Sequence, residues 1–314
     1  MKMNKNLTKI STVNMSHEEW LNHRSKTIGG SDASAILGMN SYSSPYTVWA
    51  EKLGKLPPKE DNEAMRIGRD LEDYVAKRFT EATGKKVRRE NNILINPEYP
   101  FAHANVDRMI IGEDAGLECK TTSQLNLSKF KNGEFPDNYY AQAVHYMLVT
   151  GCKRWYLAVL VLGRGFFDFV IERDEEEIKA LAKSEADFWE YVKTETPPAA
   201  DGTDSTSKTI STIFPNSNTE TVNLFAYDDA LKQYIALGKQ IKELKTLQDE
   251  MANKVKSFMN EAGKGESNSF KVSWTTAEKA TFDHKRFAEE HPNVNLTDYY
   301  NHSSYRTFKV TEKK

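Results

Sequence analysis

Apolar residues recur along the first 193 residues at spacings that predict helices and strands in mixed order. The clearest helix is predicted over residues 63–83, because apolar side chains fall on or near one of its faces and Gly84 stops it. Further helices are predicted at residues 17–24, 31–38 (with Ser31 as its N-cap), 46–54, 138–150 and 174–193. Strands are predicted at residues 86–96, 102–111 and 116–121, with a hairpin at 154–162 and 166–172. This order predicts an α/β (α+β) fold.

Three segments depart from this pattern. Residues 1–15 are predicted to be a flexible leader, and residues 196–222, rich in Ser, Thr, Pro, Asp and Asn, a linker. The first domain would then cover residues 1–195, and a C-terminal extension would cover residues 223–314. The extension is predicted to hold a long helix near 227–262, a strand near 270–274, a helix near 283–290 and a last strand near 305–310.

The long helix carries residues at alternating spacings of three and four, which is typical of a coiled-coil seam with one polar position. The seam consists of Tyr234, Leu237, Ile241, Leu244, Gln248, Met251, Val255 and Phe258. Such a seam fits oligomerisation or the docking of a partner. It also fits a helix that packs on its own domain, which is the simpler interpretation.

The composition disfavours several classes of protein. The chain has 314 residues with 43 basic and 45 acidic side chains, and this net charge of −2 argues against a passive nucleic-acid coat protein. A local basic groove is still compatible with it. The apolar runs are shorter than the ~20 residues that a bilayer requires, and the N-terminal residues lack the apolar region of a signal peptide. Two cysteines alone build neither a disulfide framework nor a zinc site, so we expect a cytoplasmic protein without membrane contact.

Acidic side chains and a lysine gather on the predicted strands. Asp107 lies toward the end of the second strand, and Glu118 and Lys120 share one face of the third because strand side chains alternate. If these strands pair, Asp107 and Glu118 converge. Two carboxylates with a strand carbonyl suit Mg²⁺ or Mn²⁺, and a nearby lysine can orient or deprotonate a water or stabilise charge on a phosphate. This is the chemistry of hydrolytic nucleases.

A structural explanation competes with the catalytic one. A Glu-x-Lys pair on one strand face is often a solvated ion pair, and an aspartate at a strand end often forms a turn. The combination of Asp107, Glu118 and Lys120 with an acidic helix before the strands and a polar helix after them favours a catalytic site.

Five motifs in a fixed order resemble those of a known family: WLNHRSKTIGGSDASAILG, RIGRDLEDYVAKRF, NVDRMI, LECKTT and YYAQAVHYML. Over residues 17–193 the chain resembles the YqaJ-type viral recombinases and phage lambda exonuclease-like alkaline exonucleases of the PD-(D/E)xK nuclease superfamily. This resemblance implies a restriction-endonuclease-like core, with a central mixed β-sheet flanked by helices. Val106 replaces the proline of the motif, which affects only turn geometry.

The resemblance implies a metal site in the strands. Asp107 and Glu118 match the metal-binding carboxylates, the backbone carbonyl of Cys119 would be a further ligand, and Lys120 matches the catalytic lysine. Glu72 matches a helical acidic residue that assists a metal. The expected cofactor is Mg²⁺ or Mn²⁺, as one or two ions.

The choice of Glu72 depends on helical phase. Asp70 and Asp73 lie nearby, but Glu72 follows Leu71 and lies five residues after Ile67. A surface carboxylate is the structural alternative.

Arg24 and Ser31 match the pocket that receives a DNA 5′-phosphate in this family. A guanidinium group beside a helix N-terminus forms an anion site. Asn105 is expected to add a hydrogen bond in the same region. The structural alternatives are an N-cap role for Ser31 and a surface charge for Arg24.

Gln142 and Tyr146 are four residues apart on a predicted helix and therefore share a face. The resemblance implies that this face lines the site, where Gln142 binds a phosphate or a water; Tyr146 fits equally well as a core aromatic. His103 lies four residues before Asp107 and is a candidate to support the site.

Together these features imply a metal-dependent deoxyribonuclease that degrades double-stranded DNA from its ends in the 5′→3′ direction. The 3′ overhangs would serve phage-type recombination by strand annealing, with a single-strand annealing protein as partner. Related enzymes form trimeric rings, and a phage or prophage origin in a bacterial host is expected. The alternatives are a structure- or site-specific endonuclease of the same superfamily and a non-catalytic DNA-end-binding accessory protein.

Overall fold

The computed structural model describes residues 6–313, which form two units. Unit 1 ends at Phe214 and unit 2 begins at Pro215. The boundary therefore lies within the segment predicted as a linker, about twenty residues after the predicted end of the first domain at residue 195.

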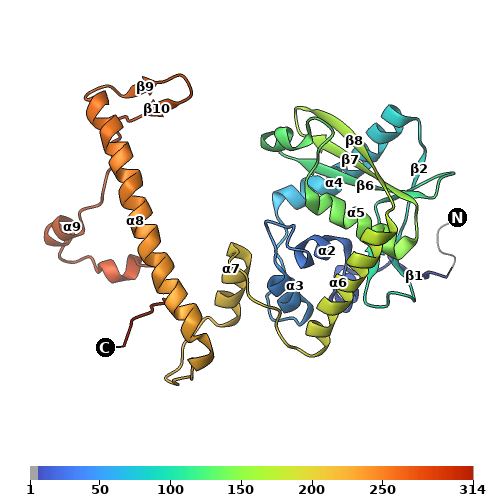
Figure 1. The fold of residues 1–314 in the computed structure, drawn as a ribbon, viewed down its shortest axis with the longest axis horizontal. Helices are drawn as coiled ribbons and strands as arrows, with labels where there is room; N and C mark the ends of the chain where they lie inside the picture. The colour runs from blue at the N-terminus through green and yellow to red at the C-terminus, as the bar shows by residue number, and fades with distance from the viewer. Residues whose placement is uncertain (1–5, 314) are drawn as a thin grey trace. The chain divides into compact units, whose positions relative to one another are not determined.

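A five-stranded β-sheet forms the centre of unit 1 (Figure 1). Its strand order is β2-β5-β6-β7-β8, with β6 and β7 parallel and the other neighbours antiparallel, so the sheet is mixed as predicted. The parallel pair requires a crossover, which α5 supplies between the two strands. The elements are β2 (Val87–Arg89), β5 (Arg108–Ile110), β6 (Ala115–Thr122), α5 (Asp137–Thr150), β7 (Arg154–Val161) and β8 (Gly165–Glu172).

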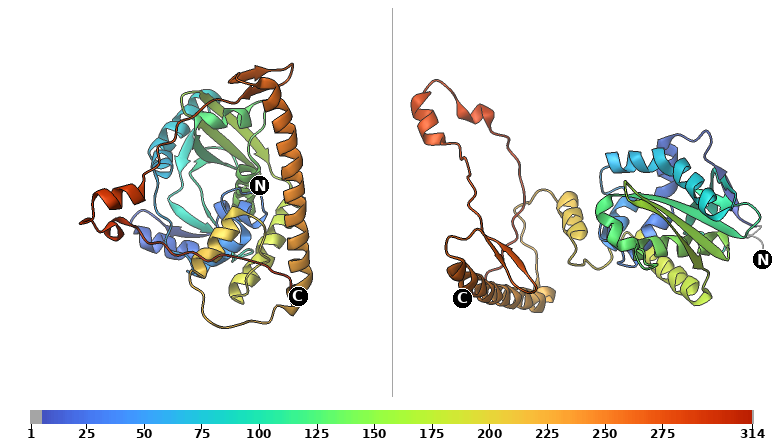
Figure 2. Two further views of the ribbon diagram at one scale, coloured as in Figure 1. Left: turned by 90° about the vertical axis from the view of Figure 1, so that its left-hand side faces the viewer. Right: turned by 90° about the horizontal axis from the view of Figure 1, so that it is seen from above.

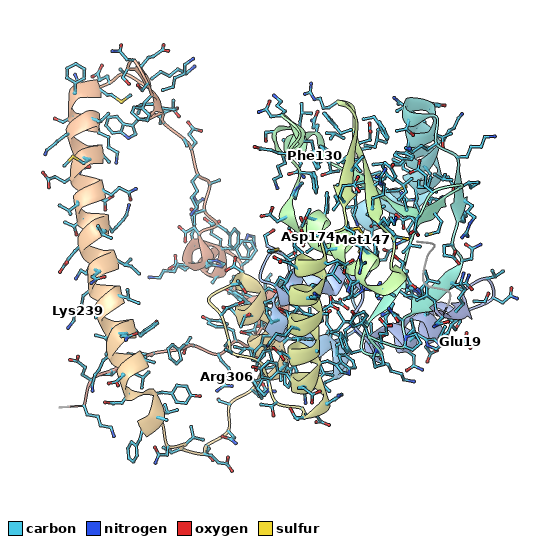
Figure 3. The ribbon with its side chains drawn as sticks, turned by 45° about the vertical axis from the view of Figure 1, so that its right-hand side comes forward. Glu19, Phe130, Met147, Asp174, Lys239 and Arg306 are labelled. Atoms are coloured by element: carbon cyan, nitrogen blue, oxygen red, sulfur yellow. The ribbon has the colours of Figure 1, made fainter. Side chains whose placement is uncertain are left out.

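Helices cover both faces of this sheet (Figure 2). On one face, α4 (Glu63–Thr83) buries Phe79 against Tyr156 of β7. On the other face, α5 buries Met147 in the same cluster as Trp155 of β7 (Figure 3). Adjacent residues of β7 thus point to opposite helices, as the alternation of strand side chains requires.

The segments 86–96 and 102–111, each predicted as a single strand, form two strands apiece. In each segment the chain leaves one sheet and enters another. β1 (Thr8–Ser11), β3 (Asn92–Ile95) and β4 (His103–Asn105) make a second sheet in the order β1-β3-β4. The change of sheet between β4 and β5 falls at Val106 and Asp107. A strand that switches sheets stays extended, so the local pattern does not reveal the break.

Two segments predicted to lack packed structure contain regular elements. Residues 8–11 of the predicted leader pair with β3, and residues 1–5 lie outside the described part. α7 (Asp204–Ile213) lies within the predicted linker and packs on α3 (Pro45–Lys52). This contact uses hydroxyl groups, since the Oγ1 atoms of Thr47 and Thr209 are 2.8 Å apart. Because α7 packs through serine and threonine hydroxyl groups, its sequence is as polar as that of a linker, and the helix was therefore not predicted.

The remaining elements of unit 1 are α1 (His17–Ser25), α2 (Gly30–Ile36), the 3-10 helix η1 (Gln124–Phe130) and α6 (Glu175–Lys193). The N-cap of α2 is Gly29, so the prediction that Ser31 caps this helix is wrong. Ser31 lies inside the first turn. The Asp32 carboxylate accepts a hydrogen bond from the Gly29 backbone at 2.8 Å and closes the helix start instead.

Unit 2 is built around one long helix. Within the unit, the predicted seam of α8 is not covered: Ile241 is 67% exposed and Leu244 is 65% exposed. The predicted strand at 305–310 does not form. Neither α8 nor any other helix in residues 6–313 is both long and apolar enough to cross a membrane. The elements are η2 (Phe225–Tyr227), α8 (Asp228–Met259), β9 (Lys264–Glu266), β10 (Lys271–Ser273), α9 (His284–Glu290) and η3 (Leu296–Tyr299).

Candidate active site

The break between β4 and β5 places Asp107 beside β6. Arg108 pairs with Leu117 in the antiparallel register, so Asp107 lies opposite Glu118. Asp107 Oδ2 accepts a hydrogen bond from the backbone N–H of Cys119 at 2.8 Å. The structure therefore brings together the carboxylates of Asp107 and Glu118, as the predicted strand pairing required.

Glu118 is the centre of a hydrogen-bonded group on the α5 side of the sheet. Its Oε1 atom lies 2.6 Å from Lys120 Nζ and accepts a hydrogen bond from Gln142 Nε2 at 2.8 Å. Gln142 Nε2 also lies 2.8 Å from Tyr146 Oη. Glu118 Oε2 is buried and has no hydrogen-bond partner among residues 6–313. One oxygen of a nearly buried carboxylate is thus available to a ligand.

The surroundings shift the pKa values of both Asp107 and Lys120 upward, with opposite effects on their charges. Burial, together with the carboxylates of Glu118 and Glu72, raises the pKa of Asp107 well above its usual range. Burial opposes a charge on Lys120, but the Glu118 carboxylate outweighs it and raises the pKa of the ammonium group. The ion pair with Glu118 therefore favours the charged form of Lys120. The repulsion at Asp107 marks a place where a further cation would stabilise the folded protein.

Glu72 is half-buried and close enough to Asp107 to raise the pKa of that carboxyl group, whereas Asp70 and Asp73 are exposed. Its carboxylate does not point freely at Asp107, because Glu72 Oε1 is bound by the guanidinium group of Arg108. Arg108 also donates to the backbone carbonyl of Asp107 at 2.6 Å and to Asp73 Oδ1 at 2.6 Å. Sequence reasoning overlooked Arg108, although it directly follows Asp107 in the NVDRMI motif.

The donor set fits a hard divalent cation. Mg²⁺ is usually held by one or two carboxylates and keeps several waters. Asp107 and the unpartnered oxygen of Glu118 supply two such groups, and the Cys119 backbone lies beside them. No group of three or more His, Cys, Asp or Glu side chains in residues 6–313 is arranged as a metal site, which agrees with the pairing of Glu72 to Arg108.

Arg24 and Ser31 are in direct contact, since Arg24 Nη2 donates to Ser31 Oγ at 3.0 Å. The guanidinium group also lies over the Trp20 ring, 4.7 Å from its centre, which fixes the side chain. Below them, Lys52 Nζ lies 2.6 Å from Asp32 Oδ2. The pKa of Asp32 is lowered despite its burial, because Lys52 and Arg24 outweigh the loss of solvent. Arg24 and Lys52 thus bring two positive charges to this cluster against the one negative charge of Asp32.

This pocket adjoins the carboxylate site through α5. A Cβ atom added to Gly30 would lie 2.6 Å from the Tyr146 ring and 3.1 Å from Gln142 Cγ, so only glycine allows α2 to approach this closely. Gln142 in turn binds Glu118. The start of α2 and the carboxylate site are thus neighbours across two side chains, and Tyr146 both packs in the core and touches the site.

His103 and Asn105 lie on β4, on the far side of the sheet change from Asp107. His103 packs against Gly29 and its Nδ1 atom lies 2.8 Å from Thr27 Oγ1. Burial and the positive charge of Arg24 lower its pKa to about 3, so it stays neutral. The side-chain amide of Asn105 is buried without a hydrogen-bond partner among the described residues. His103 thus supports the Arg24 pocket rather than Asp107.

Comparisons with known proteins identify a family and a similar fold for this chain. The model of the YqaJ-like viral recombinase domain matches residues 19–153. The chain is 40% identical over 286 residues to the uncharacterized protein YqaJ of Bacillus subtilis, covering 89% of this chain and 90% of that protein. The alkaline exonuclease LHK-Exo of Laribacter hongkongensis, solved in complex with dAMP, is similar in fold with a TM-score of 0.50 and 21% identity, over 57% of this chain and 93% of that one. The chain therefore belongs to the family of YqaJ-like viral recombinases, and its mixed α/β core has a fold similar to that of the alkaline exonuclease.

Proposed function

We propose that this protein is a metal-dependent exonuclease that degrades double-stranded DNA from a 5′ end and leaves a 3′ single strand. The observation that carries the proposal is the buried cluster of Asp107, Glu118 and Lys120, in which Glu118 Oε2 lacks a partner. A solvated surface ion pair would not bury a carboxylate oxygen without a partner. The fold similarity to an alkaline exonuclease supports the same chemistry.

Each side chain has a distinct role in this proposal. Asp107 and Glu118 would hold a Mg²⁺ or Mn²⁺ ion, with the Cys119 carbonyl as a further ligand and Glu72 in support. A bound divalent ion would supply a water of lowered pKa and neutralise phosphate charge. Lys120, whose charged form the Glu118 carboxylate favours, would face the scissile phosphate and stabilise the extra charge that develops there. Gln142 positions Glu118 and presents its amide to the same phosphate.

The 5′→3′ polarity rests on the Arg24 pocket. Arg24 and Ser31 offer a guanidinium group and a hydroxyl group to a terminal phosphate. The Asn105 amide, which is buried without a partner among the described residues, would add further donors if it reaches the same phosphate. Because this pocket and the carboxylate site meet across Gln142 and Tyr146, a strand end held in one would present its next phosphodiester to the other.

The proposal is tested by digestion of linear duplexes. With Mg²⁺ we expect mononucleotide release from 5′-phosphorylated ends faster than from 5′-hydroxyl ends, and none with EDTA. Cleavage of closed circular DNA would instead indicate an endonuclease. DNA-end binding without cleavage in Mg²⁺ would indicate an accessory protein.

Arg24→Ala separates end recognition from catalysis. The variant should lose the preference for 5′-phosphorylated ends while still cutting 5′-hydroxyl ends. Lys26→Ala is the matched control, because it removes an exposed charge just after α1. An unaltered preference in Arg24→Ala would remove Arg24 from the pocket.

The expected product suggests the partner. A 3′ single strand is the substrate of a single-strand annealing protein, and the description of the family as viral recombinases supports this role. We further propose assembly into a ring around DNA. Sedimentation of the protein with and without duplex DNA tests the ring, with a monomer in both conditions as the contrary result.

A further inference from the structure

A groove of about 420 Å³ lies at the end of β6, immediately beyond the carboxylate site. We call it the β6-end groove. Its walls come from the loop after α2, from the end of β6 with η1, and from the start of α5. The side chains that line it include Tyr42, Asn126, Lys129, Glu134, Asp137, Asn138 and Tyr139.

Tyr139 is shared between the groove and the carboxylate site. Lys120 Nζ lies over the Tyr139 ring, 5.4 Å from its centre. The buried ring of Phe130 also packs on Tyr139, with ring centres 6.3 Å apart and planes inclined by 22° (Figure 3 labels Phe130). The ring of Tyr139 is therefore held in place before any ligand enters.

The chemistry of the walls differs from that of the Arg24 pocket. Lys129 is accompanied by the carboxylates of Glu134 and Asp137, so a phosphate would meet more negative than positive charge. The groove instead offers aromatic faces and amides. Tyr42 is 84% exposed, so its ring is open to a ligand, and Asn126 and Asn138 add amide groups to the walls. Aromatic faces with amides suit a flat, uncharged ligand with polar edges.

The position of the groove along α5 decides which part of a DNA strand it meets. Tyr146 adjoins the Arg24 pocket, Gln142 binds Glu118, and Tyr139 borders the groove. The three sites therefore follow one another along the helix. A strand with its 5′-phosphate at Arg24 and its first phosphodiester at Glu118 and Lys120 would carry its second nucleotide toward the groove.

We propose that the β6-end groove binds the unpaired nucleobase of the second nucleotide from the 5′ end, stacked on Tyr42. The inference rests on the proposed exonuclease function. Stacking of a base on an aromatic side chain tolerates every base, as an end-degrading enzyme requires. The groove would thus hold the strand on the 3′ side of the bond that is cut, which then becomes the new 5′ end.

The test compares 5′-phosphorylated duplexes that are intact, abasic at nucleotide 2, or abasic at nucleotide 1. The rate of the first cleavage is measured with excess enzyme and Mg²⁺. The unmodified protein should cut the duplex that is abasic at nucleotide 2 about 5-fold or more slowly than the intact duplex, since base stacking on an aromatic ring contributes this much or more. The duplex that is abasic at nucleotide 1 should show a smaller change.

Tyr42→Ala should cut the intact and the nucleotide-2 abasic duplexes at the same rate. Tyr42→Phe keeps the ring and should retain the difference. An equal loss for the nucleotide-2 abasic duplex in both Tyr42→Ala and the unmodified protein would overturn the role of Tyr42. A larger loss at nucleotide 1 would overturn the placement. If the unmodified protein cuts all three duplexes at the same rate, the proposed base binding in the groove is wrong while the nuclease function stands. If it cuts none of them, both the proposed function and this inference are wrong.

Discussion

The two units use apolar residues in opposite ways. In unit 1 the sheet has a helix on each face, and large side chains such as Phe79 and Trp155 are fully buried. In unit 2 the side chains of the α8 seam stay exposed, and Met259 is the one buried apolar residue among the described residues of that unit. Both units show clear apolar periodicity in the sequence. Periodicity therefore predicts an element, but it does not predict what covers its apolar face.

The physical reason is the number of layers. A mixed sheet with helices on both faces encloses a core. One long helix with a two-stranded hairpin cannot do so, since an isolated hairpin is marginally stable by itself. Equivalent substitutions in the two units should therefore have different effects on stability and activity.

The largest difference concerns charge. Lys120→Ala should lower the rate of DNA cleavage by about 10³-fold, because a positioned charged group typically contributes this much. Lys239→Ala, on the exposed surface of α8 (Figure 3), should leave the rate unchanged. Steady-state digestion of linear DNA measures both variants. Activity of Lys120→Ala within about twofold of the unmodified protein would refute a role for this lysine, given that such roles contribute ~10²-fold or more.

Leucine truncation compares the two apolar faces. Leu148→Ala, in the core of unit 1 at 1% exposure, should lower the free energy of unfolding by about 2–5 kcal/mol. Leu244→Ala in the α8 seam should change it by less than about 0.5 kcal/mol. Urea unfolding followed by circular dichroism measures both. A cost for Leu244→Ala close to that of Leu148→Ala would show that the seam is covered in solution.

The buried His103 of unit 1 should make the stability of the protein depend on pH. Because the pKa of His103 is lowered to about 3, the folded protein leaves this ring neutral while the unfolded chain takes up a proton below its usual pKa of 6.5. The contribution that neutral His103 makes to the free energy of unfolding is complete above pH 6.5 and is lost as the pH falls toward 3. Between about pH 7 and pH 5 the unmodified protein should lose about 2 kcal/mol more than His103→Asn. Parallel pH dependences of the two proteins would contradict the lowered pKa.

Replacing a glycine by alanine should destabilise unit 1 but stabilise unit 2. Gly30→Ala meets the Tyr146 ring and should destabilise unit 1 by about 1–3 kcal/mol. Gly238→Ala has open space in α8 and should stabilise that helix by about 0.5–1 kcal/mol. Thermal unfolding of both variants provides the measurement. Stabilisation by Gly30→Ala would show that α2 and α5 are not in close contact.

Local sequence signals predicted much of unit 1. The helix at 63–83, the strand with Glu118 and Lys120, and the hairpin after α5 all lie close to their predicted positions. These elements carry strong periodicity and clear stop signals such as Gly84, which ends α4 in a left-handed conformation. By contrast, α7 and β1 were missed, because their contacts involve hydroxyl groups and a distant strand rather than an apolar pattern.

Some features of the candidate site also follow from local sequence signals, whereas others depend on contacts between elements. The sequence by itself determined the side chains of the site and, through strand alternation, that Glu118 and Lys120 share a face. Only the tertiary structure decided that Arg108 binds Glu72, that His103 supports the Arg24 pocket rather than Asp107, and that Tyr139 connects Lys120 to a groove. Each of these contacts joins residues from different elements. Spacing along the chain fixes direction within one helix or strand, whereas contacts between elements depend on how the sheet and its helices pack.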